Sequence, residues 1–259
     1  MTVATQLAKY IRFWGGALHC NICNRPLRKF FPFSTDLQQA ARTHGFPYDF
    51  RRMETLNVDQ CNCPFCLSND RERLYLIFLL AYLQKNPGKF RLLDFAPSPK
   101  FSKRLRSLPQ IDYTSADLLR DDVDVQVDIC DLSLFGDNSF DIIICSHVLE
   151  HVSDADKAMR ELARVLKPDG WAIIMVPLFW DVSETIEDSA YNNAALRTRH
   201  YGQYDHVRLF SHDDFIARLS AAGFNVRQVT PGSLDPEQIR KNAIAANSIL
   251  YVCTLNAGS

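Results

Sequence analysis

The stretch from Phe140 to Pro177 reads FDIIICSHVLEHVSDADKAMRELARVLKPDGWAIIMVP. Its apolar run from Ile142 to Cys145 is short and β-branched, which predicts a buried parallel strand. Apolar residues then recur at helical spacing, with charges on the opposite face: Ala158, Leu162, Val165 and Leu166. Lys167 to Gly170 breaks this helix, and Trp171 to Val176 predicts a second buried strand. Strand, helix, turn and strand together predict one βαβ unit.

Further strands and helices are expected on both sides of this unit. The chain has 259 residues, 47% of them hydrophobic, enough for one large core or one core plus a small module. Helices are expected over 2–13, 71–84 and 100–108 and from Ser211 onward. Strands are expected over 91–95, 111–116, 123–127, 225–230 and 248–254. Residues 178–210 are predicted to form a long irregular insertion. The pattern predicts an α/β fold with a largely parallel sheet.

The segment from Phe140 to Pro177 closely resembles the class I S-adenosylmethionine (SAM) methyltransferases over their fourth strand, following helix and fifth strand. The resemblance covers roughly residues 90–230 and implies a Rossmann-like, seven-stranded methyltransferase sheet whose final strand is antiparallel. The turn Phe95-Ala96-Pro97 is similar to a type 11-like subgroup that often carries an N-terminal cysteine cluster. We therefore expect a small zinc-binding module over residues 1–70 and a methyltransferase domain over 71–259.

The resemblance places SAM at the ends of the first strands. Asp94 stands at the family's acidic position, while Ala96 and Ser98 replace its glycines. We expect Pro97 and Pro99 to keep φ negative in this turn, so that small residues serve there.

The adenosine end of SAM is expected at the ends of the next strands. Asp117 is predicted to accept the ribose hydroxyls, with a helix N-cap as the alternative role. The resemblance places Asp128 beside the adenine amino group, the backbone N–H of Ile129 near a ring nitrogen, and Ser146 at the end of the fourth strand among the cofactor contacts.

Eight cysteines are present, and four of them form the knuckles Cys20-x-x-Cys23 and Cys63-x-x-Cys66. Each knuckle supplies two sulfurs, so four thiolates can converge tetrahedrally on one Zn²⁺. The prediction is a structural zinc ion, with Cys61 as a rival ligand to Cys63. The alternatives are reduced core or surface cysteines and, less favoured, a redox pair.

The insertion ends in the polar and aromatic cluster Tyr204-Asp205-His206-Val207-Arg208, where α/β folds build substrate sites. A similar segment occurs in the resembling subgroup. His206 is predicted to be the general base, since an imidazole titrates near neutrality, and His147 is its competitor. Asp205 is considered as the group that orients His206. Arg208 is expected either to hold an anionic substrate or to pair with a core acid.

The pattern His147-x-x-Glu150-His151 matches an inverted zinc-protease motif. We reject that interpretation because the pattern follows a parallel strand rather than lying within a helix. The related quinone O-methyltransferases place metal ligands at these positions, although His147 replaces their first acid. A hydrogen-bonded network under the cofactor is favoured, and a catalytic metal near Glu150 and His151 stays open.

The sequence predicts a SAM-dependent methyltransferase acting on a small-molecule or saccharide acceptor, at a hydroxyl. The net charge of −1 argues against extensive nucleic-acid contact, and the absence of a long apolar run predicts a cytoplasmic protein without a membrane span. An RNA base methyltransferase is the enzyme alternative, because residues 1–53 are basic. A catalytically silent SAM-fold binding protein is the other, because the glycines are missing. The oligomeric state stays open.

Overall fold

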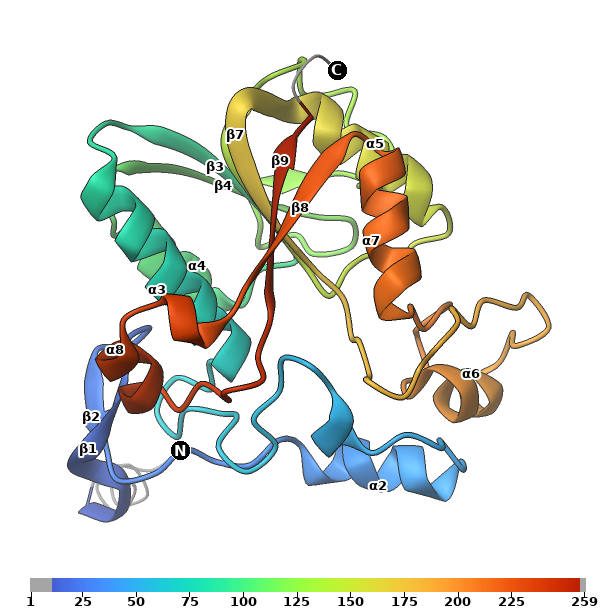
Figure 1. The fold of residues 1–259 in the computed structure, drawn as a ribbon, viewed down its shortest axis with the longest axis horizontal. Helices are drawn as coiled ribbons and strands as arrows, with labels where there is room; N and C mark the ends of the chain where they lie inside the picture. Colours follow the sequence, from blue (N-terminus) through green and yellow to red (C-terminus); the bar gives the residue numbers. More distant parts are fainter. Residues whose placement is uncertain (1–10, 257–259) are drawn as a thin grey trace.

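The computed structural model describes residues 11–256, and its centre is a seven-stranded mixed sheet of order β5-β4-β3-β6-β7-β9-β8 (Figure 1). The strands are β3 (Phe90–Phe95), β4 (Ile111–Asp117), β5 (Val125–Gln126), β6 (Phe140–Ser146), β7 (Leu166–Met175), β8 (Phe224–Val229) and β9 (Leu250–Leu255). The first five are parallel, and β9 lies antiparallel between β7 and β8. The predicted sheet, including its antiparallel last strand, is confirmed.

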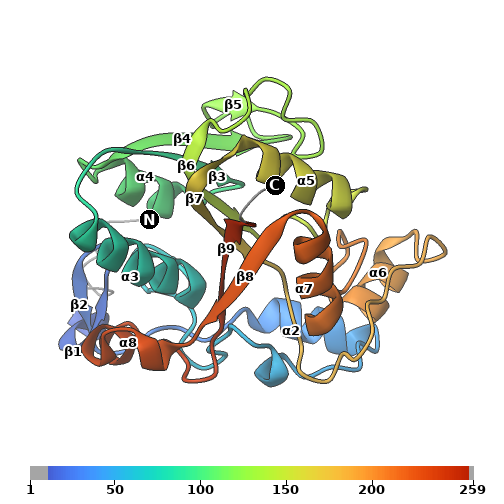
Figure 2. The same cartoon turned by 45° about the horizontal axis from the view of Figure 1, so that its top comes forward.

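Helices cover both faces of the sheet (Figure 2). Helices α3 (Asp70–Lys85) and α4 (Pro99–Arg106) lie on one face, and α5 (Ala155–Val165) and α7 (His212–Ala221) lie on the other. Each begins at a side-chain cap: Asn69, Ser98, Asp154 and Ser211. Each cap accepts a hydrogen bond from a backbone N–H of the first turn, which would otherwise lack a partner. Local polar residues therefore fix where these helices start.

The core is densest around β6. Its residues Ile142, Ile143 and Ile144 are almost fully buried between β3 and β7. A strand covered by helices on both faces needs apolar side chains on both faces, which is why this segment is continuously hydrophobic.

The N-terminal residues form β1 (Trp14–Cys20), β2 (Arg25–Leu27), α2 (Thr35–Thr43) and the short 3-10 helix η1 (Phe50–Arg52). Residues of β1 and β2 share the hydrophobic core of the sheet, whereas α2 and η1 pack in a second cluster that includes Ala41, Met53 and Phe179. The Thr55 hydroxyl donates to the carbonyl of Ile249 at 2.7 Å, and Met53 forms an isolated bridge with Phe179 after β7. This segment lies beyond the carboxyl ends of the parallel strands (Figure 1).

Several predicted boundaries differ from the observed ones. Residues 178–210 contain α6 (Ala194–Tyr201), so the insertion is not wholly irregular. Strand β7 already pairs at Leu166, and the predicted break at 167–170 is a register shift within the strand. Strand β5 is shorter than expected because Asp124 pairs with the Ser115 side chain instead of extending the ladder. The helix expected over 2–13 falls mostly outside the described residues.

Besides α6 and the 3-10 turns η1 and η2 (Pro231–Ser233), four elements were not predicted: β1, β2, α2 and the six-residue α8 (Pro236–Lys241), which follows η2. Helix α2 buries only Ala41, so its sequence carries little apolar periodicity.

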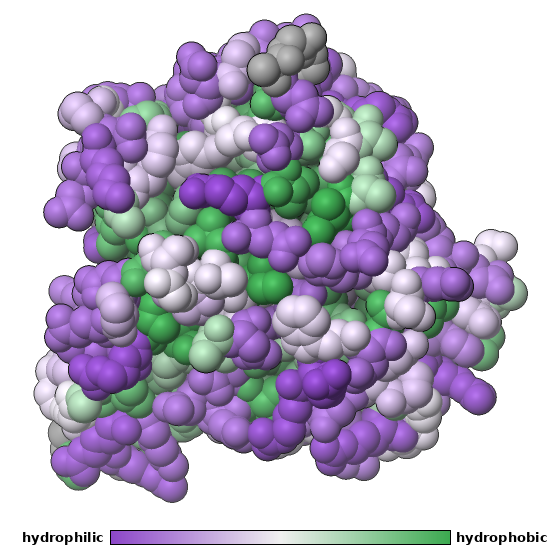
Figure 3. Space-filling model, in the orientation of Figure 1, coloured by the Kyte–Doolittle hydropathy of each residue, from purple (hydrophilic) through white to green (hydrophobic). Residues whose placement is uncertain are grey.

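The outer surface is mixed. Figure 3 shows apolar side chains reaching the middle of the face seen in Figure 1, surrounded by hydrophilic ones. A groove of about 610 Å³ lies between α3, β8 and α8. Within residues 11–256, no helix is both long enough and apolar enough to cross a membrane.

Candidate functional site

A cavity of about 220 Å³ lies at the carboxyl ends of β3 and β6 and the start of α3. We call it the cofactor cavity. Its polar lining includes Arg71, Glu72, Asp94, Ser146 and His147. The carboxyl edge of a parallel sheet is where α/β folds bind ligands, and the sequence places polar side chains there after apolar strands.

Asp94 lies deep in this cavity and accepts a hydrogen bond from the Tyr113 hydroxyl at 2.8 Å. Burial raises the pKa of Asp94 to about 8, opposed by the Tyr113 hydrogen bond and reinforced by the nearby charge of Glu72. Burial likewise raises the pKa of Glu72. Two buried acids facing one cavity favour a ligand with a cationic group, since a positive charge would stabilise both carboxylates.

The turn after β3 departs from the expected backbone geometry. Ala96 has φ of +50°, whereas negative φ was expected, so that expectation is wrong at this residue. The reason is that Pro97 fixes only its own φ. Ser98 has φ of −72° and caps α4, accepting from the N–H of Phe101 at 3.4 Å. Ala96 therefore adopts the left-handed conformation that glycine normally provides, at a cost of about 1–2 kcal/mol.

The cofactor cavity gathers Asp94, Ala96, Ser98 and Ser146 from the predicted cofactor residues. The Ser146 hydroxyl lies 2.8 Å from that of Tyr75, which connects the end of β6 to α3.

The other three predicted cofactor residues lie at the ends of β4 and after β5, outside this cavity. Asp117 accepts two backbone N–H groups of its own turn at 2.8 and 3.0 Å through one carboxylate oxygen. Asp128 is exposed and accepts the N–H of Cys130 at 2.8 Å, and Ile129 is buried. Asp117 thus holds a turn and caps no helix, so the N-cap considered as its alternative role is not observed; its second oxygen is not used in this turn.

A second cavity of about 230 Å³ adjoins the first, and we call it the acceptor cavity. Of the described residues, Arg71 and His147 line both. One wall is apolar and comes from the N-terminal segment and the residues after β7: Phe33, Leu37, Phe50, Met53, Pro177 and Phe179. The opposite side is polar: Glu150, His151, Gln203 and His206.

Gly202 also lines this cavity. It ends α6 with a φ of +86°, and a Cβ atom at this position would lie 3.0 Å from the Phe46 ring.

His147 and Glu150 form the boundary between the two cavities. Nδ1 of His147 lies 3.2 Å from Oε1 of Glu150. Burial lowers the pKa of His147 to about 4, so its imidazole is neutral at pH 7. Burial alone would raise the pKa of Glu150, but the imidazoles of His147, His206 and His151 lower it to about 2. The site thus combines a buried carboxylate with a neutral imidazole.

His206 packs edge-to-face on His151, with ring centroids 4.7 Å apart. Burial lowers the pKa of His206. Asp205 lies 3.5 Å from Nδ1 of His151, so the expected pairing of Asp205 with His206 is not observed. Successive residues of this loop point in different directions, and Tyr204 is exposed. The structure brings His206 together with Glu150 and His151, which the sequence did not predict.

The side chain of Arg208 is held by contacts within the fold. It is buried and donates to the carbonyls of Leu149 at 2.6 Å and Val152 at 2.5 Å, and it pairs with Glu187. These bonds hold the turn after β6, and the Arg208 side chain lies outside the acceptor cavity. Arg208 therefore pairs with an acid, but Glu187 is exposed and is not the core acid that was expected.

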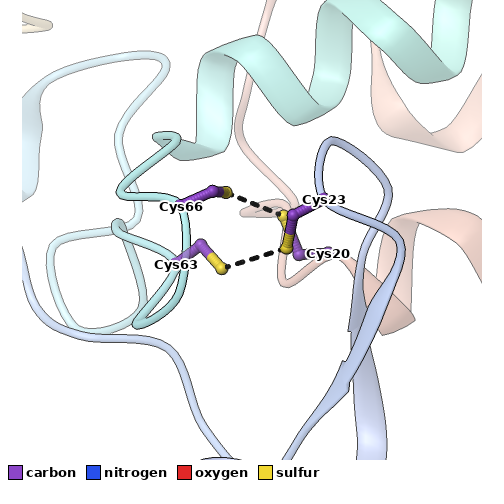
Figure 4. Close-up of side chains that lie close together, drawn as sticks. All are labelled: Cys20, Cys23, Cys63 and Cys66. Atoms are coloured by element: carbon purple, nitrogen blue, oxygen red, sulfur yellow. Dashed lines mark hydrogen bonds between the residues drawn. The ribbon is translucent and has the colours of Figure 1, made fainter. Parts of the chain in front are cut away.

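The four cysteines of the two knuckles meet beside α3 (Figure 4). The Sγ atoms of Cys20 and Cys66 are 3.6 Å apart, and those of Cys23 and Cys63 are 3.8 Å apart. Four sulfurs at about 2.3 Å from a tetrahedral ion would be separated by about 3.8 Å, so the cluster fits Zn²⁺. These distances are far from the roughly 2.05 Å of a disulfide.

The surroundings of the cluster also fit a thiolate site. The Ser68 hydroxyl lies 3.3 Å from Cys20 Sγ, and the backbone N–H of Phe65 points to Cys63 Sγ at 3.4 Å. Cys61 lies outside the cluster, because its Sγ contacts Asp70 Oδ1 at 3.5 Å. Burial raises the pKa of Cys61 to about 12, which keeps it a thiol.

Some site residues were missed. Arg71, Glu72 and Tyr75 line the cofactor cavity, but in the sequence they only extend a helix. The available signal was the capping pair Asn69 and Glu72, which places the helix N-terminus next to the site. Phe33 and Phe50 of the N-terminal segment line the acceptor cavity, a position that the sequence did not indicate.

Known proteins are similar to this chain in sequence and in fold. Residues 68–229, more than half of the chain, match a family model described as a methyltransferase domain. A 36-residue segment is 61% identical to the uncharacterized methyltransferase YcgJ of Bacillus subtilis, covering 14% of each chain. A 61-residue segment is 36% identical to the ubiquinone/menaquinone biosynthesis C-methyltransferase UbiE of Haemophilus ducreyi, covering 22% of this chain and 24% of that one.

These matches thus span less than a quarter of either relative's length. Among solved structures, the crystal structure of YcgJ from Bacillus subtilis aligns with a TM-score of 0.46 and 19% identity, over 71% of this chain and 100% of that one.

Proposed function

This chain belongs to the family of methyltransferase domains and is a SAM-dependent methyltransferase, and on that premise we propose that it methylates a small-molecule acceptor at a hydroxyl group. The observation that carries the proposal is the pair of adjoining cavities, which share Arg71 and His147. One cavity suits the cofactor and the other a small acceptor. Holding the two reactants side by side is the main requirement of methyl transfer, because proximity removes much of the entropic barrier.

The cofactor supplies an electrophilic methyl group. The buried acids Asp94 and Glu72 suit its ammonium group, and Arg71 suits its carboxylate. Asp117 is proposed for the ribose hydroxyls through its second oxygen, and Asp128 and Ile129 for the adenine. Ala96 and Ser98 form the turn beside the cofactor cavity, with Ala96 in the conformation that glycine usually provides.

The acceptor cavity supports a compound with an apolar body. Its wall of Phe33, Phe50 and Phe179 favours an aromatic or aliphatic hydroxyl compound over a saccharide. The relatives named for ubiquinone and menaquinone biosynthesis support a small-molecule acceptor. An apolar body would lie against the aromatic wall, with its hydroxyl toward the polar side.

Loss of the hydroxyl proton requires a group at the boundary of the two cavities. His147 and His206 were both predicted for this role, and both line the acceptor cavity. The geometry favours His147 for the proton, because it also borders the cofactor cavity. Glu150, at 3.2 Å, would stabilise the imidazolium that forms.

We also propose that the four-cysteine cluster binds a structural Zn²⁺, which holds the N-terminal segment in place. The sulfur spacing and the Ser68 and Phe65 contacts support this. The zinc site would thereby fix the part of the apolar wall of the acceptor cavity that the N-terminal segment supplies.

An RNA base acceptor is the second candidate. A cavity of about 310 Å³ beside Cys23 and Cys66 is lined by four cations, Arg25, Lys100, Lys103 and Arg104, which suit a phosphate backbone. The same cations would also offset the negative charge of a zinc tetrathiolate, so the small-molecule acceptor is preferred.

The test is transfer of an isotopically labelled methyl group from SAM to three acceptor panels: apolar phenols and alcohols, saccharides, and RNA. Label in the apolar hydroxyl panel is expected. Label confined to RNA would contradict the proposal and favour the second candidate, and label confined to saccharides would contradict the role given to the apolar wall.

A further inference from the structure

Glu150, His151 and His206 bring three potential ligand atoms within 4.8 Å of one another. Two come from the turn after β6 and the third from the end of the insertion. The two segments are fixed together, because the N–H of Val207 donates to the carbonyl of Glu150 at 2.9 Å. Arg208 adds its bonds to Leu149 and Val152 on either side. The three side chains are therefore held close by backbone contacts rather than by each other.

Two of these residues have buried polar atoms without partners. Glu150 is 1% exposed, and neither of its carboxylate oxygens has a hydrogen-bond partner within residues 11–256. Its contact with His147 has the distance but not the alignment of a hydrogen bond. Nδ1 of His206, a residue 6% exposed, also lacks a partner there. Buried polar atoms are rarely left unpaired because they lose their hydration without gaining a partner, so these atoms point to a missing ligand.

Further polar groups lie beside the imidazoles of His151 and His206. Nδ1 of His151 lies 3.5 Å from Asp205, while its Nε2 lies 4.0 Å from Oε1 of Glu150. Nδ1 of His206 has no partner within the described residues, and the backbone of Tyr201 lies beside its ring. In His151 an oxygen of Asp205 lies beside one ring nitrogen, and the other nitrogen lies nearer to Glu150. This is the arrangement that orients histidine ligands around metal ions.

We propose that Glu150, His151 and His206 bind one divalent transition-metal ion. Two imidazoles and one carboxylate suit ions such as Zn²⁺, Co²⁺ or Fe²⁺ rather than Mg²⁺ or Ca²⁺. All three residues line the acceptor cavity, so the remaining coordination positions face the space where the acceptor lies. There the ion would bind an acceptor oxygen. That use rests on the proposed function, whereas metal binding itself does not.

The test is titration of Co²⁺ into protein whose cysteine cluster is already filled with zinc. Cobalt bound by thiolates gives an intense charge-transfer band, whereas cobalt bound by nitrogen and oxygen gives only weak visible bands. We expect the weak bands alone and, after desalting, one cobalt and one zinc per chain by elemental analysis. Glu150→Gln and His206→Ala should each weaken cobalt binding at least tenfold.

His200→Ala is the matched control, since His200 stacks on Tyr191 away from the cluster and its loss should leave cobalt binding unchanged. Zinc content and unfolding temperature report whether each variant folds. If a variant fails to fold, His151→Ala replaces it, because this ring is partly exposed, and it too should weaken binding at least tenfold. Absence of cobalt binding in the wild type, or wild-type affinity in the folded variants, would overturn the proposal. SAM calorimetry on the cobalt-free protein tests the methyltransferase function separately.

Discussion

The Sγ atom of Cys23 lies 3.8 Å from that of Cys63, although 40 residues separate the two in the chain. This contact joins the β1–β2 turn to the loop before α3. If zinc occupies the cluster, metal–sulfur bonds join these two segments.

Removing one cluster cysteine should therefore release the metal. We expect about one zinc per chain in the wild type and none in Cys23→Ser or Cys66→Ser. Structural zinc contributes on the order of 10 kcal/mol in isolated small domains, so increased proteolysis of residues 11–70 should accompany the loss. Cys61→Ser is the matched control, because Cys61 faces Asp70 and its variant should keep zinc. Wild-type protein purified without chelator and lacking zinc would refute the assignment.

The second prediction concerns the pH dependence of stability. Asp94 has a pKa of about 8 in the folded state, raised by burial from 3.8. Between these values the folded state keeps a proton that the unfolded state has lost. Its contribution to the free energy of unfolding therefore falls as pH rises toward 8, by at most about 1.4 kcal/mol per pH unit.

Asp94→Asn should remove this contribution. Urea unfolding of the ligand-free protein between pH 5.5 and 8 should show the wild type losing stability relative to the variant as pH rises. Asp112→Asn, on an exposed position of the same sheet, should follow the wild type. Parallel curves for wild type and Asp94→Asn would show that this carboxyl group is not protonated in the fold.

The third prediction separates the two roles of Asp117. Asp117→Asn keeps an oxygen for the turn N–H groups, whereas Asp117→Ala loses it. Loss of a hydrogen bond to a charged partner costs roughly 1.5–3 kcal/mol, so Asp117→Ala should weaken SAM binding about tenfold or more. Asp117→Asn should fall between Asp117→Ala and the wild type. Undiminished affinity in Asp117→Ala would mean that the ribose is held elsewhere.

The fourth prediction concerns the two histidines of the acceptor cavity. His206 borders this cavity alone, so His206→Ala should lower turnover with SAM affinity nearly intact. His147 borders both cavities, so His147→Ala should lower turnover by about 10²-fold or more and weaken SAM binding as well. Turnover and calorimetry on both variants, beside His200→Ala, check this. Equal losses of SAM affinity in His206→Ala and His147→Ala would contradict the account in which only His147 borders the cofactor cavity.

The sequence predicted the sheet well because buried strands such as 142–145 have a local signature in their own residues. Asp94, Ser98 and Ser146, which the sequence grouped together, line one cavity, because the ends of neighbouring parallel strands meet at one edge. The conformation of Ala96 was not predicted, because it depends on the tertiary path of the turn.

Contacts between distant segments were also beyond the sequence. No local pattern relates Glu150 to His206 or Phe33 to Phe179, because these pairs meet only after the insertion and the N-terminal segment pack over the sheet. The orientation of Asp205 toward His151 rather than His206 likewise depends on the backbone of one loop.

Calorimetric titration of the wild-type protein with SAM tests the central claim most directly. The account predicts saturable binding of one SAM per chain, abolished or weakened at least tenfold by changes in the cofactor cavity such as Asp94→Ala, and unaffected by Asp112→Asn. A wild-type protein that is folded and zinc-loaded yet shows no binding of SAM would contradict the account.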